Sequence, residues 1–104
     1  KGRIPLGKVV EICCYNPARI FGLLPQKGIL RVGSDADLIM VDLDKEVTVS
    51  NDILHSPFLG WTIYEGWTFK GWPILTMLRG RIIMQNGNII GEPGYGRYIA
   101  PHCS

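Results

Sequence analysis

Few side chains in this sequence combine the residue types and the spacing that metal chemistry requires. Its 104 residues include two histidines and three cysteines, and none of them forms a His-x-His, His-x-x-x-His or Cys-x-x-Cys pattern. A zinc site would have to be assembled from distant segments, with Cys13, Cys14, His55 and Cys103 as ligands. Because adjacent cysteines bind one ion awkwardly, we favour one core thiol and one thiol beside a helix, and we expect no metal site.

Two aspartates form a second candidate. Asp35 and Asp37 could bind a cation or act as paired acid–base carboxylates, since alternate residues of an extended segment project similarly. Ser34 and Asp35 directly follow a glycine, which is typical of a turn whose side-chain oxygens accept backbone N–H groups. We favour the turn, so these residues are expected to precede a buried strand rather than to catalyse.

Other catalytic patterns are incomplete. His55 beside Ser56 resembles a base next to a nucleophile, but sequence neighbours rarely reach that geometry and no third member is evident. Gly91, Gly94 and Gly96 resemble a phosphate-binding loop, yet they neither follow a buried parallel strand nor open a helix. The sequence therefore predicts no catalytic residue.

Aromatic and cationic side chains are interleaved in the second half of the chain and could form a platform for single-stranded nucleic acid. The residues concerned are Trp67, Phe69, Lys70, Trp72, Arg79 and Arg81. The net charge of +2 is too small to indicate a nucleic-acid or membrane partner, and no run of about 18 apolar residues occurs. We favour core and rim positions for these residues, which leaves a free-standing nucleic-acid-binding module as the alternative.

The elements that would position these residues begin with helices. A short amphipathic helix is predicted by four apolar residues that share one helical face, namely Leu6, Val9, Val10 and Cys13. Asn16 and Pro17 have the types expected at an N-cap and a first helical position, so a second helix is predicted to begin there. Gly22 and Pro25 predict its end.

Strand patterns dominate after residue 27. Residues 37–43 are nearly all apolar, which predicts a strand covered on both faces, and residues 46–50 alternate as a half-buried strand does. A β-meander is predicted over residues 73–78, 81–85 and 88–90. Its two hairpin turns would be Arg79–Gly80 and Asn86–Gly87, each with a glycine where a two-residue turn needs positive φ.

Irregular segments flank the predicted meander. Residues 51–71 contain five aromatic side chains, which should pack onto the sheet or onto a neighbouring domain or subunit. Residues 91–99 are rich in glycine and proline, which predicts an extended tail with aromatic anchors.

Composition bounds the class of protein. A hydrophobic content of 46%, a charged content of 19% and a mean hydropathy of +0.12 exclude disorder and are apolar for a free-standing soluble domain. A complete (β/α)₈ barrel needs about 250 residues, so the chain is one domain or a piece of one. The lack of an initiator Met and of a signal-peptide core favours a piece of a longer protein. Three cysteines without a disulfide framework favour reduced thiols and a cytoplasmic location.

Several short motifs, in this order, resemble the C-terminal quarter of the cyclic amidohydrolases, which include hydantoinase, dihydropyrimidinase, allantoinase and dihydroorotase. They are Lys1-Gly2-Arg3-Ile4, Asn16-Pro17-Ala18-Arg19, Phe21-Gly22-Leu23, Lys27-Gly28, Gly33-Ser34-Asp35-Ala36-Asp37-Leu38, Tyr64-Glu65-Gly66, Gly71, Arg79-Gly80 and Gly94-Tyr95-Gly96-Arg97-Tyr98. Tyr64-Glu65-Gly66-Trp67 is similar to the hydantoinase and dihydropyrimidinase branch, which we favour. Ser56-Pro57-Phe58-Leu59-Gly60 is similar to allantoinase and dihydroorotase.

The resemblance implies a mainly β fold with N-terminal helices, which would be the last helix and the C-terminal part of the β-sandwich of a composite TIM-barrel amidohydrolase. It divides the chain into barrel and exit helices over residues 1–24, sandwich strands over residues 25–91 and an extended tail over residues 92–104. The parent enzyme would hydrolyse the C–N bond of a cyclic amide at a two-metal zinc centre whose ligands and catalytic groups lie upstream of this chain. The segment itself would be structural and inactive alone.

The resemblance also implies the partners. They are the rest of the parent chain, meaning the barrel and the N-terminal strands, and further copies in a homo-oligomer. Tyr95, Arg97 and Tyr98 are the expected oligomer contacts in the tail. A module whose only role is oligomerisation is a third possibility, because of the aromatic stretch over residues 58–69.

Overall fold

The computed structural model describes residues 2–55 and 60–102, and it contains two compact units. Unit 1 consists of Lys1–Leu38, Leu78–Arg81 and Glu92–Ser104, and unit 2 of Ile39–Met77 and Ile82–Gly91. Among the described residues, no helix has the length and apolar character needed to cross a membrane.

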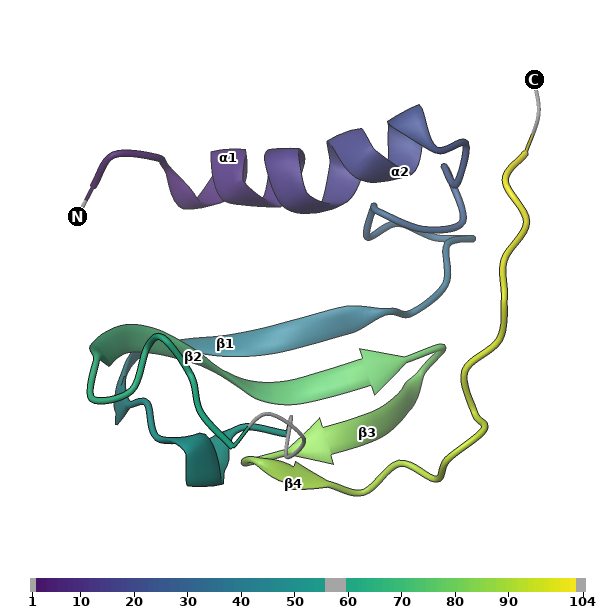
Figure 1. Ribbon diagram of the computed structural model, residues 1–104. Helices are drawn as coiled ribbons and strands as arrows, with labels where there is room; N and C mark the ends of the chain where they lie inside the picture. Colours follow the sequence, from purple (N-terminus) through teal and green to yellow (C-terminus); the bar gives the residue numbers. More distant parts are fainter. Residues whose placement is uncertain (1, 56–59, 103–104) are drawn as a thin grey trace. The chain divides into compact units, whose positions relative to one another are not determined.

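The N-terminal helical segment of unit 1 runs from α1 (Leu6–Val10) through a π-helical stretch, η1 (Glu11–Tyr15), into α2 (Asn16–Ile20) (Figure 1). α2 begins at Asn16 as predicted, but Asn16 has the helical angles φ −63° and ψ −45°, so the prediction that it is the N-cap of a separate helix is wrong. The physical reason lies in the π-helical turn before Pro17. Its wider hydrogen-bonding pattern accommodates the proline ring and the missing N–H, so the helical segment continues.

The C-terminus of α2 has the predicted glycine cap. Gly22 has φ +69°, and the N–H of Leu23 donates to the carbonyl oxygen of Ala18 at 2.8 Å. The N–H of Gly22 donates to the carbonyl oxygen of Arg19 at 3.3 Å, which completes a Schellman motif. Ala18 is only 5% exposed and is the buried apolar residue of this segment.

The four strands form one mainly antiparallel sheet in the order β1 (Leu38–Thr48), β2 (Thr68–Leu78), β3 (Arg81–Gln85) and β4 (Asn88–Ile89) (Figure 1). Met84 of β3 pairs with Ile89 of β4. All four turn residues have positive φ, with 46° at Arg79, 79° at Gly80, 50° at Asn86 and 81° at Gly87. Both turns are therefore of type I′, and the predicted meander is confirmed.

β1 differs from its prediction in two ways. It is a single strand of 11 residues instead of two, and the Asp42 carboxylate accepts the backbone N–H of Asp44 at 3.0 Å within it. Ile39 and Met40 lie on opposite faces, yet they are 62% and 52% exposed. The prediction of a strand covered on both faces is thus wrong for these two described residues, because more than half of each side chain is in contact with solvent.

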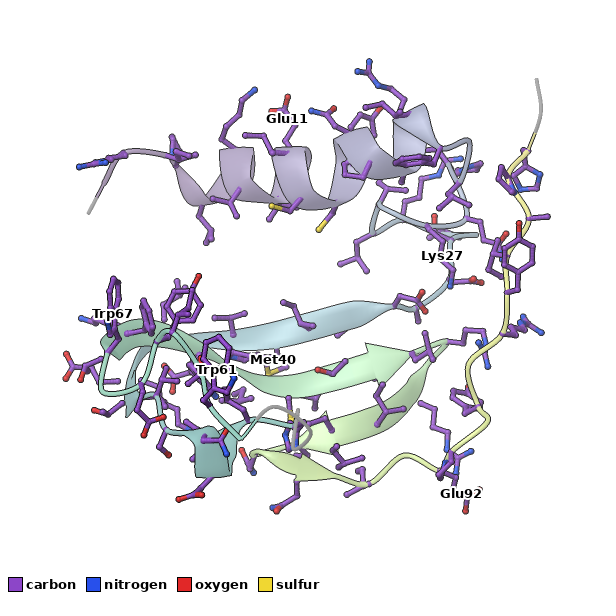
Figure 2. The ribbon with its side chains drawn as sticks, viewed as in Figure 1. Glu11, Lys27, Met40, Trp61, Trp67 and Glu92 are labelled. Carbon is purple, nitrogen blue, oxygen red and sulfur yellow. The ribbon has the colours of Figure 1, made fainter. Side chains whose placement is uncertain are left out.

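Three aromatic side chains of unit 2 cluster where β2 begins. The rings of Tyr64 and Trp67 meet edge to face with centroids 5.8 Å apart, and Phe69 lies 6.0 Å from Trp67. The N–H of Val49, which is 5% exposed, donates to the carbonyl oxygen of Trp67 at 2.8 Å and holds this turn on the sheet. Trp67, whose side chain is labelled in Figure 2, belongs to this cluster. It remains 57% exposed.

The aromatic stretch extends beyond this cluster. Trp61 is exposed, Phe69 belongs to β2 instead of the predicted irregular segment, and Phe58 lies outside the described residues. A short 3₁₀ helix, η2 (Asn51–Ile53), follows β1.

Candidate functional site

The most connected group of charged side chains in unit 1 centres on Lys27. Its ammonium lies 2.8 Å from a carboxylate oxygen of Asp35 and contacts Asp37 as well. The other oxygen of Asp37 accepts the backbone N–H of Arg79 at 2.8 Å, and the Gln26 amide donates to Asp35 at 3.0 Å. The Lys27 ammonium thus connects its own loop with the loop that holds Asp35 and Asp37. Through Asp37 this network reaches Arg79 at the tip of the β2–β3 hairpin.

Backbone contacts bring these loops together. The N–H of Asp35 donates to the carbonyl oxygen of Gln26 at 3.0 Å, and the N–H of Gly80 donates to Ala36 at 3.0 Å. The N–H of Ser34 donates to Arg31 at 3.1 Å and closes the predicted turn. The partners of the Asp35 and Asp37 carboxylates differ from the prediction. Instead of local backbone N–H groups, both contact Lys27, and Asp37 also accepts the distant backbone N–H of Arg79.

The ion pairs shift two pKa values. Hydrogen bonds from Lys27 and then Gln26 hold the pKa of Asp35 below its usual 3.8. Partial burial acts to lower the pKa of Lys27, but the hydrogen bonds and charges of Asp35 and Asp37 outweigh it, so this pKa is raised above 10.5. Lys27 and Asp35 are therefore both ionised at neutral pH, which suits a structural ion pair and does not suit acid–base catalysis.

A second cluster fixes the tail. The guanidinium carbon of Arg79 lies 4.3 Å from the centroid of the Tyr95 ring, and that of Arg81 lies 5.1 Å away. Arg79 also donates to the carbonyl oxygen of Tyr95. Two cations on one ring make Tyr95 an anchor within its own chain.

The other tail residues lie in irregular backbone. Arg97 and Tyr98 are exposed, Tyr98 at 86%, and an oligomer contact by either remains a prediction. The N–H of His102 donates to the carbonyl oxygen of Gly22 at 2.8 Å. Gly91, Gly94 and Gly96 follow β4 without opening a helix within the described residues.

The aromatic and cationic residues that could have formed a nucleic-acid platform belong to different clusters. Trp67 and Phe69 pack with Tyr64, Lys70 lies 3.4 Å from a carboxylate oxygen of Asp44, and Trp72 is half-buried in β2. Arg79 and Arg81 contact Tyr95 in unit 1. Unit 2 has five acidic residues against two lysines, a net charge of −3, whereas unit 1 has nine cationic and four acidic residues, a net charge of +5.

The potential metal ligands that the structure describes are not arranged to bind zinc. Over residues 2–55 and 60–102, no three His, Cys, Asp or Glu side chains are placed to hold one metal ion together. Cys13 and Cys14 are exposed, as are His55 and His102. Cys103 of the distant-segment zinc candidate and Ser56 of the His–Ser pair lie outside the described residues.

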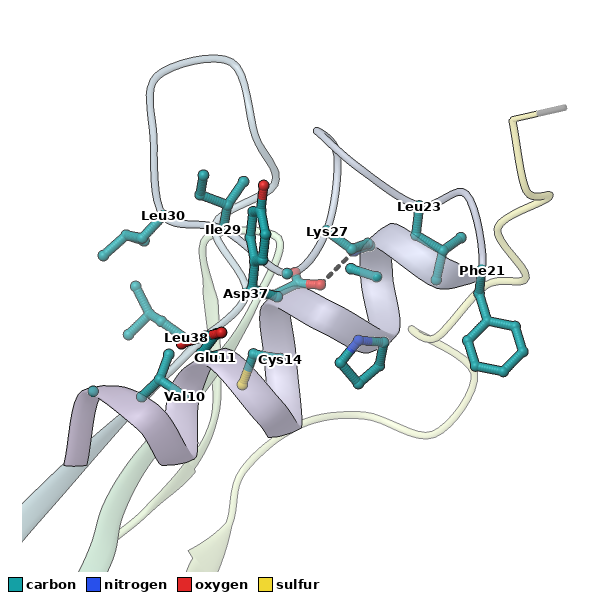
Figure 3. A pocket seen from close by; sticks show the side chains of 15 residues that line it. Val10, Glu11, Cys14, Phe21, Leu23, Lys27, Ile29, Leu30, Asp37 and Leu38 are labelled. Atoms are coloured by element: carbon teal, nitrogen blue, oxygen red, sulfur yellow. Dashed lines mark hydrogen bonds and ion pairs between the residues drawn. The ribbon is translucent and has the colours of Figure 1, made fainter. Parts of the chain in front are cut away.

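An open groove of about 690 Å³ lies within unit 1, between the helical segment and the loop that follows it (Figure 3). Its walls are mostly apolar, with Val10, Cys14 and Phe21 on the helical side and Ile29 and Leu30 on the loop. Neither this groove nor the contacts of Lys27 could be predicted from the sequence, because each depends on segments that meet only in three dimensions.

Known proteins are similar to this chain in sequence and contain the same combination of a helical segment and a meander. The sequence model of the amidohydrolase family matches residues 1–83. The L-hydantoinase of Paenarthrobacter aurescens is 40% identical over 95% of this chain, and the dihydroorotase of Pyrococcus furiosus is 44% identical over 95% of it. These matches cover 21% and 23% of the two relatives, so the chain spans about a fifth of their length.

The solved structures agree with the sequences. A D-hydantoinase structure superposes with a TM-score of 0.90 at 39% identity, over 94% of this chain and 21% of that one. An L-hydantoinase (dihydropyrimidinase) from Arthrobacter aurescens gives the same TM-score over 95% of this chain and 22% of its own. The predicted fold class is confirmed, and the chain belongs to the amidohydrolase family.

Proposed function

We propose that this chain is the C-terminal structural segment of a metal-dependent cyclic amidohydrolase, acting on hydantoins and dihydropyrimidines or on dihydroorotate or allantoin. In that reaction water adds to a ring carbonyl carbon, the C–N bond breaks and the nitrogen takes up a proton. The segment supports the enzyme and contributes no group to this step, since its described ionisable clusters are engaged in structural contacts.

The main support for the proposal is the number of large apolar side chains that are exposed to solvent. Large hydrophobic residues that are more than half exposed occur in both units, and they include Leu6, Ile20, Phe21, Leu30, Val32, Ile39, Leu43, Trp61, Ile63 and Trp67. Contiguous apolar surfaces of this kind of side chain are typical of interaction sites. A polypeptide several times longer, as in the relatives, offers the surface to cover them.

The same proposal gives each part of the chain a place in the parent enzyme. Residues 1–24 would be the last barrel helix and the exit, residues 25–91 sandwich strands and residues 92–104 a tail that contacts another subunit. Zinc would be the parent's metal, bound outside the described residues of this chain. Exposed adjacent thiols at Cys13 and Cys14 favour the reducing cytoplasm. A nucleic-acid or membrane partner is not expected.

A chimera tests the proposal. The 99 matched residues of the P. aurescens L-hydantoinase are replaced by the aligned residues of this chain, and hydantoin hydrolysis is measured. We expect a soluble, active chimera and no hydrolysis by the 104-residue chain with added zinc. A control chimera with Ala18→Asp, which puts a charge at a buried site, should lose solubility. Hydrolysis by the 104-residue chain alone would overturn the structural role.

A further inference from the structure

The turn between β3 and β4 places an asparagine directly before a glycine at an exposed site. Asn86 and Gly87 have φ +50° and +81°, and both residues are exposed. Among the described residues, the Asn86 side-chain amide has no hydrogen-bond partner, and the Gly87 backbone N–H has no acceptor. The side-chain carbonyl carbon of Asn86 and the nitrogen of Gly87 are therefore free to react with each other.

The peptide bond between these two residues is not crowded. A Cβ built on Gly87 would meet no atom within 4 Å, so there is space around this residue for a ring to form. Glycine also carries no side chain of its own that would hinder an attack by its nitrogen. Asn88, by contrast, precedes Ile89, whose β-branched side chain crowds the nitrogen that would have to attack. The reactive pair is therefore Asn86 with Gly87.

The hairpin opposes the necessary rearrangement only weakly. The Gly87 nitrogen reaches the Asn86 side chain after rotation about the Asn86 Cα–C bond, which displaces Gly87 and β4. β4 is two residues long, lies at one end of the sheet order and pairs through Ile89 with Met84 of β3. The Asn86 N–H, which donates to the Ile74 carbonyl oxygen at 2.8 Å, lies on the other side of the rotating bond and keeps its partner. Such a short terminal strand opens locally at a low cost in free energy.

We propose that Asn86 is a site of spontaneous deamidation. The Gly87 nitrogen loses its proton and forms a bond to the side-chain carbonyl carbon of Asn86. The bond from that carbon to the side-chain nitrogen breaks, and this nitrogen takes up a proton and leaves as ammonia. Water then opens the resulting succinimide ring. Attack of water at the side-chain carbonyl gives aspartate, and attack at the backbone carbonyl gives isoaspartate, in which the main chain runs through the side-chain carbons.

The two products have different consequences for the hairpin. Aspartate before glycine suits a two-residue turn with positive φ, so this product keeps the fold and adds one negative charge to unit 2. Isoaspartate lengthens the main chain by one methylene group, which is incompatible with the type I′ turn and with the register of Met84 and Ile89. We therefore expect isoaspartate to detach β4 from β3.

Ageing of the 104-residue chain tests the proposal. The chain is kept in mildly alkaline buffer, either folded or denatured in guanidinium, and fragment mass spectrometry measures aspartate and isoaspartate at position 86. The folded chain should deamidate at a rate within about tenfold of the denatured chain, since local opening of the hairpin costs little. A larger reduction in the folded state would overturn the proposal, as would equally fast deamidation of Asn88.

Two variants serve as controls. Asn86→Asp has no side-chain amide to lose and should unfold at the same urea concentration as the fresh chain, whereas the aged isoaspartyl chain should unfold at a lower one. Equal unfolding of all three would contradict the effect on the hairpin. Asn88→Asp should leave the deamidation of Asn86 unchanged, and loss of the reaction in this variant would contradict the assignment. If the 104-residue chain lacks the circular dichroism of a folded sheet, the L-hydantoinase chimera takes its place, with hydantoin hydrolysis as the sign of its native state.

Discussion

Gly28 and Ala18 are in closer contact than any side chain at residue 28 would allow. A Cβ built on Gly28 would lie 2.2 Å from the Ala18 Cβ and 2.8 Å from the backbone oxygen of Cys14. Neither neighbour is the flexible end of a side chain, so neither can move without displacing the helix. Among the described residues of unit 1, Ala18 is also the buried apolar one. This contact therefore sets the spacing between the helical segment and the loop that carries Lys27.

Gly28→Ala should destabilise the chain severely, by about 3 kcal/mol or more, because overpacking against backbone adds to the strain of a left-handed residue. The matched control is Gly33→Ala. Gly33 has φ +94° but nothing within 4 Å of its Cβ position, so only the strain of about 1–2 kcal/mol applies. Urea unfolding followed by circular dichroism measures both. Equal losses would show that the Gly28 contact is not tight.

The Lys27 cluster should make stability depend on pH at both extremes. The lowered pKa of Asp35 means that its contribution is present above 3.8 and is lost as the pH falls through the folded value. The raised pKa of Lys27 means that its contribution is complete below 10.5 and is lost as the pH rises through the folded value. The urea midpoint should therefore be flat between these limits and should fall outside them.

Lys27→Met should flatten the acid limb of this profile, because it removes the main cause of the lowered Asp35 pKa. The control is Lys8→Met, which removes a pair with Glu11 whose side chains are 51% and 46% exposed. Such exposed pairs contribute about 0–1 kcal/mol, so the profile should hardly change. An unchanged acid limb in Lys27→Met would mean that the ion pair does not persist in solution.

Residue types at single turns were sufficient to predict the two hairpin turns and the C-terminus of α2. Asn86–Gly87 and Arg79–Gly80 place a glycine in a two-residue turn, and Gly22 closes α2 with φ +69°. Each of these signals depends on residues close together in the chain. The Lys27 cluster has no such signal, because Asp37 and Arg79 are 42 residues apart. The exposure of β1 was missed because an apolar run predicts burial without saying which polypeptide provides it.

Tyr95 and Tyr98 should respond differently to the same substitution. Tyr95→Leu removes the ring that contacts Arg79 and Arg81 and should cost about 1 kcal/mol. It should also release the tail, so that trypsin cleaves after Arg97 faster. Tyr98→Leu, at a side chain that is 86% exposed, should change neither stability nor cleavage. Equal cleavage rates in the two variants would contradict the anchoring role of Tyr95.

A substitution in the tail also tests the predicted homo-oligomer. If Tyr98 contacts a second subunit, Tyr98→Leu should shift the sedimentation of the L-hydantoinase chimera toward smaller species while leaving the 104-residue chain unchanged. Identical sedimentation of the substituted and unsubstituted chimeras would remove Tyr98 from the predicted contacts.

Single-stranded nucleic acid should not bind at the aromatic cluster. A base-stacking platform needs cations beside its rings, but Tyr64, Trp67 and Phe69 belong to a unit with a net charge of −3. Arg79 and Arg81 are occupied by Tyr95. Fluorescence anisotropy of a labelled oligothymidine should therefore stay flat on titration with the chain, even at low salt. Binding that weakens steeply with salt and is lost in Trp67→Ala, but not in the control Trp61→Ala, would restore the nucleic-acid-binding module as the function.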